Sequence, residues 1–293
     1  GPLLGSYPRS VCGAMFYWSD DLGAFVRSID QGTSWTSLTT PNANPDIDSW
    51  TAGNGKLVVI ETNGAGNQEI RVSVDNGDTW TLAYTLASSL FGLAFGTRVS
   101  EANSNRIIAA MEGNASVFFK SVISLDGGTN WTVATIAAAR LPANDAVNGY
   151  PVWDDSGRAY VGFFDQIAGT TGYIYEWIEA TGLWTAIFSA AGYQFIDSIQ
   201  LQDAVVFLVQ GPADVRLVRV RNSVVDELSI AALVGSNLAG GLASDGTTLF
   251  ALHGTGALIA IDNPTADTWA TRALTATSAP TAQTRNLSQI LAA

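Results

Sequence analysis

Short apolar segments recur along the chain, and each follows a polar turn. They are rich in β-branched and aromatic residues and include Leu57–Ile60, Ile107–Met111, Tyr160–Phe164, Val205–Val209 and Leu249–Leu252. The turns before them carry Asn, Asp, Gly or Ser, as in Asn54-Gly55 and Asp155-Ser156-Gly157. This pattern is typical of strands joined by hairpins, and no segment carries a helical period of hydrophobic positions. The sequence therefore predicts an all-β fold.

One short motif occurs three times and reads Ser-x-Asp-x-Gly-x-(Thr/Ser/Asn)-Trp, at residues 28–35, 73–80 and 124–131. Asp accepts hydrogen bonds from nearby backbone N–H groups, Gly adopts a positive φ, and Trp packs the turn onto the sheet. We expect a tight structural turn in each copy, formed by Asp30, Gly32, Trp35, Asp75, Gly77, Trp80, Asp126, Gly128 and Trp131. Degenerate copies lie at Glu179–Trp184 and Asp262–Trp269, and Arg216–Ile230 occupies the place of another without the motif.

This motif resembles the Asp-box (BNR) repeat of sialidases and many other β-propellers. The resemblance implies that each box joins the third and fourth strands of a blade, on the rim away from the ligand face. It therefore indicates an architecture and does not identify a site.

Successive copies lie about 50 residues apart, a spacing typical of propeller repeats. We predict a six-bladed β-propeller of four-stranded antiparallel blades, with a single domain at residues 7–274 and a C-terminal tail at residues 275–293. The first unit lacks an obvious innermost strand, so we expect a terminal strand to close the ring. The two candidates for it are Leu287–Leu291 and Leu3–Tyr7.

The chain is acidic and poor in charge, with 14 Lys+Arg against 26 Asp+Glu and a formal net charge of −12. Nucleic acids and anionic membranes are bound by Lys/Arg clusters, so the composition excludes both as partners. The single His and single Cys exclude a structural zinc site and an internal disulfide. No apolar stretch approaches the roughly 20 residues of a membrane-spanning helix.

A second periodicity concerns carboxylates. Glu61, Glu112 and Asp165 lie at the same distance before Trp80, Trp131 and Trp184, directly after an apolar strand, and His253 follows the equivalent strand of the last unit. We expect these strand ends to converge on one mouth of the propeller channel. Three interpretations stay open: polar strand ends that reach water, a site for a polyol or for Ca²⁺, or weak candidates for a catalytic carboxylate pair. We predict no other cofactor or metal.

Loops expected on the same face add aromatic and acidic residues, and we include them in a candidate ligand-binding set. They are Asp48, Trp50, Tyr150, Trp153 and Asp197. Aromatic faces flanked by Asp suit sugars, which stack on the ring and donate from their hydroxyls. The alternative is that the tryptophans are ordinary packing residues.

The resemblance to sialidases does not extend to catalysis. A sialidase-like active site would carry three arginines that hold a carboxylate, a Tyr nucleophile with a Glu partner, an Asp acid/base and an early Arg-Ile-Pro motif. The early segment Tyr7-Pro8-Arg9 does not match this motif, and the other arginines show no equivalent placement.

We therefore favour a non-enzymatic binding or structural propeller that recognises a glycan or protein partner. The abundance of Ala, Gly, Ser, Thr and Asn resembles that of bacteriophage tail and capsid accessory proteins, which suggests an adhesin-like module on a virion or extracellular surface. One alternative is a glycoside hydrolase that uses paired carboxylates on the channel face. The other is an architectural subunit of a larger assembly.

Overall fold

The computed structural model describes residues 9–11, 14–19, 24–38, 46–53, 55–63, 66–86, 91–100, 102–113, 119–136, 150–165, 171–201, 203–212, 214–230, 241–244, 248–252, 258–262, 264 and 270–274. These residues form strands and turns, with no helix among them, which confirms the all-β prediction. Consequently, no helix in this part of the chain is long and apolar enough to cross a membrane.

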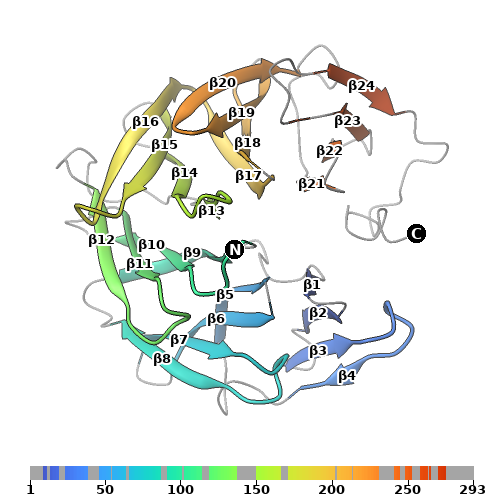
Figure 1. The fold of residues 1–293 in the computed structure, drawn as a ribbon, viewed down its shortest axis with the longest axis vertical. Coiled ribbons are helices and arrows are strands. Elements are labelled where there is room, and N and C mark those ends of the chain that lie inside the picture. Colours follow the sequence, from blue (N-terminus) through green and yellow to red (C-terminus); the bar gives the residue numbers. More distant parts are fainter. Residues whose placement is uncertain are drawn as a thin grey trace. The chain divides into compact units, whose positions relative to one another are not determined.

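Consecutive strands lie side by side in groups of four, which we call strand groups (Figure 1). The first three are β1 (Arg9–Val11), β2 (Ala14–Ser19), β3 (Ala24–Ser28) and β4 (Thr36–Ser37); β5 (Asp46–Gly53), β6 (Lys56–Thr62), β7 (Gln68–Ser73) and β8 (Thr81–Leu86); and β9 (Phe91–Val99), β10 (Ile107–Gly113), β11 (Phe119–Ser124) and β12 (Thr132–Ile136).

The remaining groups follow in chain order. They are β13 (Tyr150–Trp153), β14 (Ala159–Asp165), β15 (Thr171–Ile178) and β16 (Leu183–Ala191); β17 (Gln194–Gln200), β18 (Val205–Gln210), β19 (Val215–Arg221) and β20 (Val224–Ser229); and β21 (Leu242–Ser244), β22 (Thr248–Leu252), β23 (Leu258–Asp262) and β24 (Ala270–Leu274).

Two of these groups share one sheet. The outer strands β12 and β16 pair in parallel through Thr135 with Leu183 and Ile136 with Trp184, so β9–β16 form a single eight-stranded sheet. The indole Nε1 of Trp184 also donates to Ser121 Oγ at 2.9 Å in the buried space beside this junction.

The chain divides into two compact units. One comprises Gly1–Val147 and Trp177–Trp184, and the other comprises Asn148–Glu176 and Thr185–Ala293.

In the first unit, β6 is covered on both faces because its residues alternate in direction. Leu57 and Val59 pack with Phe16, Phe25 and other residues of the preceding strand group. Val58 and Ile60 pack on the opposite side against residues of β9, β10 and β11. Double-sided burial explains why this strand is continuously apolar.

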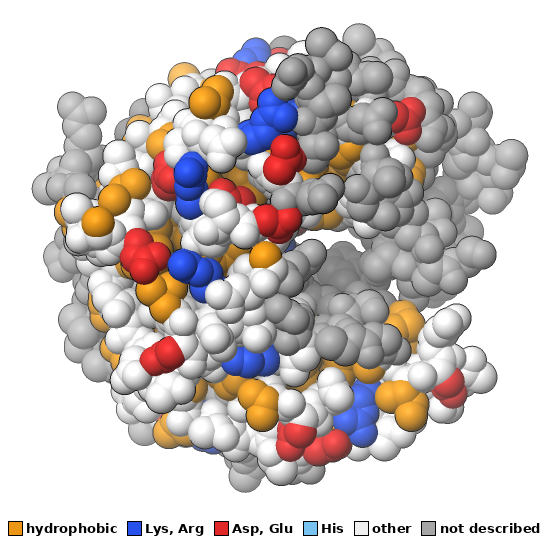
Figure 2. All heavy atoms as spheres, in the orientation of Figure 1, with side chains coloured by type: hydrophobic (Ala, Val, Ile, Leu, Met, Phe, Trp, Pro, Cys, Tyr) orange, Lys and Arg blue, Asp and Glu red, His pale blue; other side chains and the backbone are white. Residues whose placement is uncertain are grey.

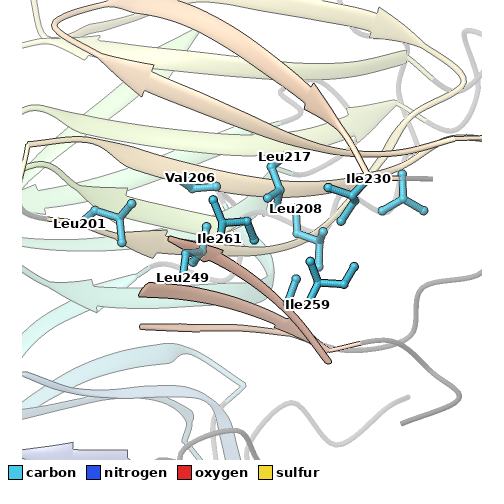
Figure 3. Close-up of a cluster of buried hydrophobic side chains, with 10 residues drawn as sticks. Leu201, Val206, Leu208, Leu217, Ile230, Leu249, Ile259 and Ile261 are labelled. Atoms are coloured by element: carbon cyan, nitrogen blue, oxygen red, sulfur yellow. The ribbon is translucent and has the colours of Figure 1, made fainter. Parts of the chain in front are cut away.

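In the second unit, strand groups stack in the same manner. Figure 3 shows Val206, Leu208 and Leu217 from β18 and β19 facing Leu249 and Ile261 from β22 and β23. A further cluster joins β14 to β17, β18 and β19 through aromatic and aliphatic side chains, including Tyr160, Phe195 and Phe207. Within each unit, successive groups thus bury apolar faces against one another.

The three motif copies form the same turn between the third and fourth strands of their groups. In the second copy, Ser73 Oγ donates to Asp75 Oδ1 and accepts from Gly77 N, both at 2.8 Å. Asp75 also accepts from the backbone N of Thr79 at 2.9 Å. The expected positive φ is present at Gly32 (88°), Gly77 (88°) and Gly128 (100°), and the residue before each glycine is left-handed as well.

Basic side chains link a strand group to the third-to-fourth strand turn of the next group, and we call these links sheet-to-turn contacts. Those described are Arg27 Nη1 to Asn76 O at 3.0 Å, Lys56 Nζ to Gly127 O at 3.2 Å, Arg106 Nη1 to Glu179 Oε2 at 3.3 Å, Arg158 Nη1 to Ser223 Oγ at 3.0 Å and Arg219 Nη1 to Pro264 O at 2.6 Å. Each contact lies within one unit. These five basic residues therefore hold neighbouring groups together.

The first strand group has an innermost described strand that the sequence did not indicate. It is β1, whose Arg9 lies opposite Phe16 and whose Val11 lies opposite Ala14 of β2. The adjacent N-terminal segment supplies this strand through a short hairpin. The candidates Leu3–Tyr7 and Leu287–Leu291, like the tail at residues 275–293, lie outside the described residues.

Candidate functional site

The three carboxylates selected by register lie at the same end of the second strand of their groups. Glu61 is opposite Glu69 on β7, Glu112 is opposite Phe119 on β11, and Asp165 is opposite Thr171 on β15. The side chains of Glu112 and Asp165 lie outside the described residues. Glu61 is therefore the member of this set whose side chain lies among the described residues.

Glu61 is fully buried and forms an ion pair with Nε of Arg71. Nη2 of Arg71 lies 2.7 Å from Oε2 of Glu69, whose other oxygen accepts from Asn63 Nδ2 at 2.7 Å. Because residues 59, 61, 69 and 71 share one face of the β6–β7 hairpin, the register brings these charges together. The guanidinium of Arg71 is thus held between the carboxylates of Glu61 and Glu69, and we call this arrangement the clamp.

Hydrogen bonds within the clamp compensate Arg71 for the hydration that it loses on burial. Burial lowers the pKa of the Arg71 guanidinium, but its hydrogen bonds to Glu61 and Glu69 more than offset this and leave the pKa raised. One oxygen of Glu61, Oε2, has no hydrogen-bond partner among the described residues. Glu61 thus acts as a buried ion-pair partner in this structure, and it does not lie at a wet strand end.

Two tryptophans assigned to the candidate ligand surface are packing residues, which corrects that assignment. Trp50 is 3% exposed, and its ring lies edge-on to Phe25 with centroids 5.4 Å apart. Trp153 is fully buried. Both lie on first strands (β5 and β13) with their rings covered by neighbouring residues, so neither ring offers a face to a sugar.

The remaining members of the ligand set fall into two classes. Asp197 on β17 accepts from the backbone N of Leu242 on β21 at 2.8 Å and from Ser198 N at 2.8 Å, so it joins two neighbouring strand groups. Asp48 and Tyr150 lie on β5 and β13 with side chains outside the described residues, and His253 lies wholly outside them.

A polar cluster that the sequence did not suggest lies at the β18–β19 hairpin. Nε of Arg216 is 2.5 Å from Oδ2 of Asp214, and Nη1 is 2.8 Å from Oε2 of Glu227. The guanidinium lies 4.8 Å from the ring centroid of Tyr193, whose hydroxyl donates to Asp214 at 3.2 Å. Ser229 Oγ donates to Asp214 Oδ1 at 2.6 Å. The cluster fastens the β16–β17 connection to this hairpin.

The electrostatics of this cluster follow from its contacts. Hydrogen bonds to Asp214 and Glu227 raise the pKa of Arg216. Burial tends to raise the pKa of Asp214, but hydrogen bonds from Ser229 and Arg216 outweigh it and leave the pKa lowered. The signal that points to this cluster in the sequence is the pair of charges at Asp214 and Arg216 around the start of β19, a strand of Val and Leu with three arginines.

Charged groups elsewhere are also distributed in pairs. In Figure 2, acidic and basic side chains are scattered over the face shown, and hydrophobic side chains lie singly among polar atoms. Among the described residues, no group of three or more His, Cys, Asp or Glu side chains is placed to hold a metal ion.

Comparison with known proteins gives the fold. No family model and no curated protein sequence matches the chain. Among solved structures, YCF48 bound to D1 peptide has a TM-score of 0.57 at 14% identity over 91% of this chain and 81% of that one. An ancestral GH74 enzyme gives 0.59 at 14% identity over 92% of this chain, and a prolyl endopeptidase gives 0.60 at 11% over 93%.

These similar structures are β-propeller proteins, so the comparison supports the predicted propeller fold. The chain covers 38% of the GH74 enzyme and 43% of the endopeptidase. The structures include both a peptide-bound protein and enzymes, and at this level of identity they inform the fold alone.

Proposed function

We propose that this chain is a six-bladed β-propeller that binds a polypeptide partner and does not catalyse a reaction. Each strand group would be one blade, and the Ser-x-Asp-x-Gly-x-x-Trp turns would be Asp boxes on the outer rim. The stacking of the first three groups in chain order, and of the last three in chain order, supports this arrangement. Closure would bring the first and last groups together.

The burial of Glu61 in its ion pair with Arg71 carries the non-enzymatic part of the proposal. A general acid or nucleophile in glycoside hydrolysis must reach the scissile bond, and its partner carboxylate must lie a defined distance away. Glu61 is fully buried and engaged by a guanidinium. The fold therefore uses this carboxylate for packing, and we assign it no role in catalysis.

A polypeptide is favoured over a glycan because the two described tryptophans of the candidate ligand set are inside the molecule. Sugar sites need an exposed aromatic face, whereas extended peptides are bound mainly through backbone hydrogen bonds and shallow apolar contacts. The similar structure of YCF48 was determined with a bound peptide, which is consistent with this choice.

The test is a parallel screen of the purified full chain against a random peptide library, a glycan array and a panel of chromogenic glycosides. The proposal expects enrichment of specific peptides with no glycoside turnover. Hydrolysis that persists in Glu61→Gln would place catalysis elsewhere and overturn the proposal. Glycan binding without peptide enrichment would contradict the choice of partner, and the absence of any hit would favour the architectural alternative.

A further inference from the structure

The outer strands of the groups differ in what their edges expose. β4 has two residues, and β20 carries Asp226 and Glu227. Short strands and charged residues are common devices that prevent an exposed edge from pairing with another chain. These two strands are therefore protected.

β8 has no such protection. Its sequence, Thr-Leu-Ala-Tyr-Thr-Leu, contains no charge, no proline and no glycine over Thr81–Leu86. It pairs with β7 on one side, and within the described part of the chain no strand pairs with its other side. An uncharged edge of this length is a template for a further strand.

The chain itself shows how such an edge is used. β12 is the counterpart of β8 in the next strand group and is also uncharged, and its edge pairs with β16 through Thr135 and Ile136. Val133 on β12 is 42% exposed, and Leu82 on β8 is 46% exposed at the matching position two residues after the motif Trp. The outer edge of a strand group in this fold thus accepts an additional strand.

The surroundings of β8 indicate the chemistry of the partner. Val74, in the turn that leads into β8, is 69% exposed, so this turn adds a second exposed apolar side chain to that of Leu82. Asp78 lies in the same turn with its side chain 58% exposed beside Arg27, whereas Asp75 accepts hydrogen bonds inside the turn. The chain as a whole has a net charge of −12, which disfavours a second copy and favours a basic partner.

We infer that β8 binds an extended segment of another protein by strand addition, and that this segment alternates apolar and hydroxyl residues and carries Lys or Arg next to Asp78. This inference rests on the proposed polypeptide binding and locates it. Backbone hydrogen bonds along β8 supply the affinity, and Leu82 and Val74 contact alternate side chains of the segment.

The experiment selects peptides from a random library of segments about ten residues long, using the full chain as bait. The affinity of each selected peptide is then measured for the wild-type chain and for the double variant Leu82→Lys/Thr85→Lys, which places two cations on β8. The matched control is Thr132→Lys/Val133→Lys on β12, where both residues are exposed and the added charge is the same. We expect the β8 variant to weaken binding by at least roughly tenfold and the control to leave it within about twofold.

Amide hydrogen exchange supplies a readout that does not depend on the variants. Bound peptide should slow exchange at Thr81–Leu86 and leave Thr132–Ile136 unchanged. Slowing at Thr132–Ile136 or at Thr185–Ala191 in place of β8, or equal losses in both variants, would overturn the β8 site. Wild-type chain that enriches no peptide contradicts polypeptide binding itself, so the two failures are distinguishable. If the Leu82→Lys/Thr85→Lys variant fails to fold, the Thr85→Lys single variant and the hydrogen-exchange data test the β8 site in its place.

Discussion

Arg219 of β19 donates from Nη1 to the backbone oxygen of Pro264 at 2.6 Å, across the boundary between two strand groups. Its other nitrogens bond to Asp226 on β20, with Nε 2.9 Å from Oδ1 and Nη2 2.5 Å from Oδ2. Arg219 is 2% exposed. Among the sheet-to-turn contacts it is the buried one, and the others lie nearer to water.

This difference in burial predicts a difference in free energy of unfolding. Arg219→Met should cost about 3 kcal/mol, because hydrogen bonds to charged groups contribute roughly 1.5–3 kcal/mol and the carbonyl of Pro264 is left buried. Arg106→Met removes an exposed pair with Glu179 and should cost less than about 1 kcal/mol. Urea unfolding of both variants measures this, and equal losses would show that burial does not set the strength of these contacts.

The Asp side chains of the motif turns, which accept hydrogen bonds inside the turn, should contribute to stability and leave partner binding unchanged. Asp75→Ala removes acceptors for Thr79 N and Ser73 Oγ and should lower the free energy of unfolding by about 1 kcal/mol, the usual net value of such bonds. Asp203→Ala, which breaks a 3.7 Å pair with Arg221, serves as the surface control. Thermal denaturation checks the prediction. Loss of partner binding by Asp75→Ala at unchanged stability would assign the turn a functional role.

The turns could be predicted from the sequence because their interactions are local. Every hydrogen bond from Ser28 or Asp30 within the first motif reaches at most four residues, so one short motif contains the complete set of partners. The strands could be predicted for a similar reason, since their alternation and turn signals lie within a few residues.

The candidate site could not be predicted in the same way. Whether Glu61 faces water depends on Arg71, which lies across a hairpin, and on the register that brings residue 59 opposite residue 71. The burial of Trp50 depends on Phe25 in another strand group. A polar residue at a strand end has the same sequence signature whether it is solvated or ion-paired, so the distinction needs the tertiary structure.

The motif carboxylates should titrate at unusually low pH. Hydrogen bonds from the Ser34 side chain and backbone lower the pKa of Asp30 to about 2, and those from the Asn130 backbone and side chain lower the pKa of Asp126 to about 2. Because the folded pKa lies below the ordinary value of 3.8, the stabilisation is complete above that value and is lost as the pH falls toward 2. Carboxyl NMR titration measures both values.

A single substitution separates the two turns in that titration. Ser34→Ala removes the largest cause of the shift at Asp30 and should move its pKa toward 3.8, while the pKa of Asp126 stays at about 2. If Asp30 keeps its low value in this variant, the hydrogen bond from the Ser34 hydroxyl is not the cause.

The pair of Glu61 and Arg71 should show strong coupling in a double-mutant cycle. Arg71→Met leaves a fully buried carboxylate without its guanidinium and should cost about 3–5 kcal/mol, the usual penalty for breaking a buried pair from one side. Glu61→Gln keeps the shape but removes the charge, so adding it to Arg71→Met should restore part of the loss, with a coupling energy of about 1–3 kcal/mol. Chemical denaturation of the two single variants and the double variant completes the cycle. Additive losses would show that the ion pair with Arg71 does not determine the conformation of Glu61. Glu61 would then again be a candidate for ligand binding.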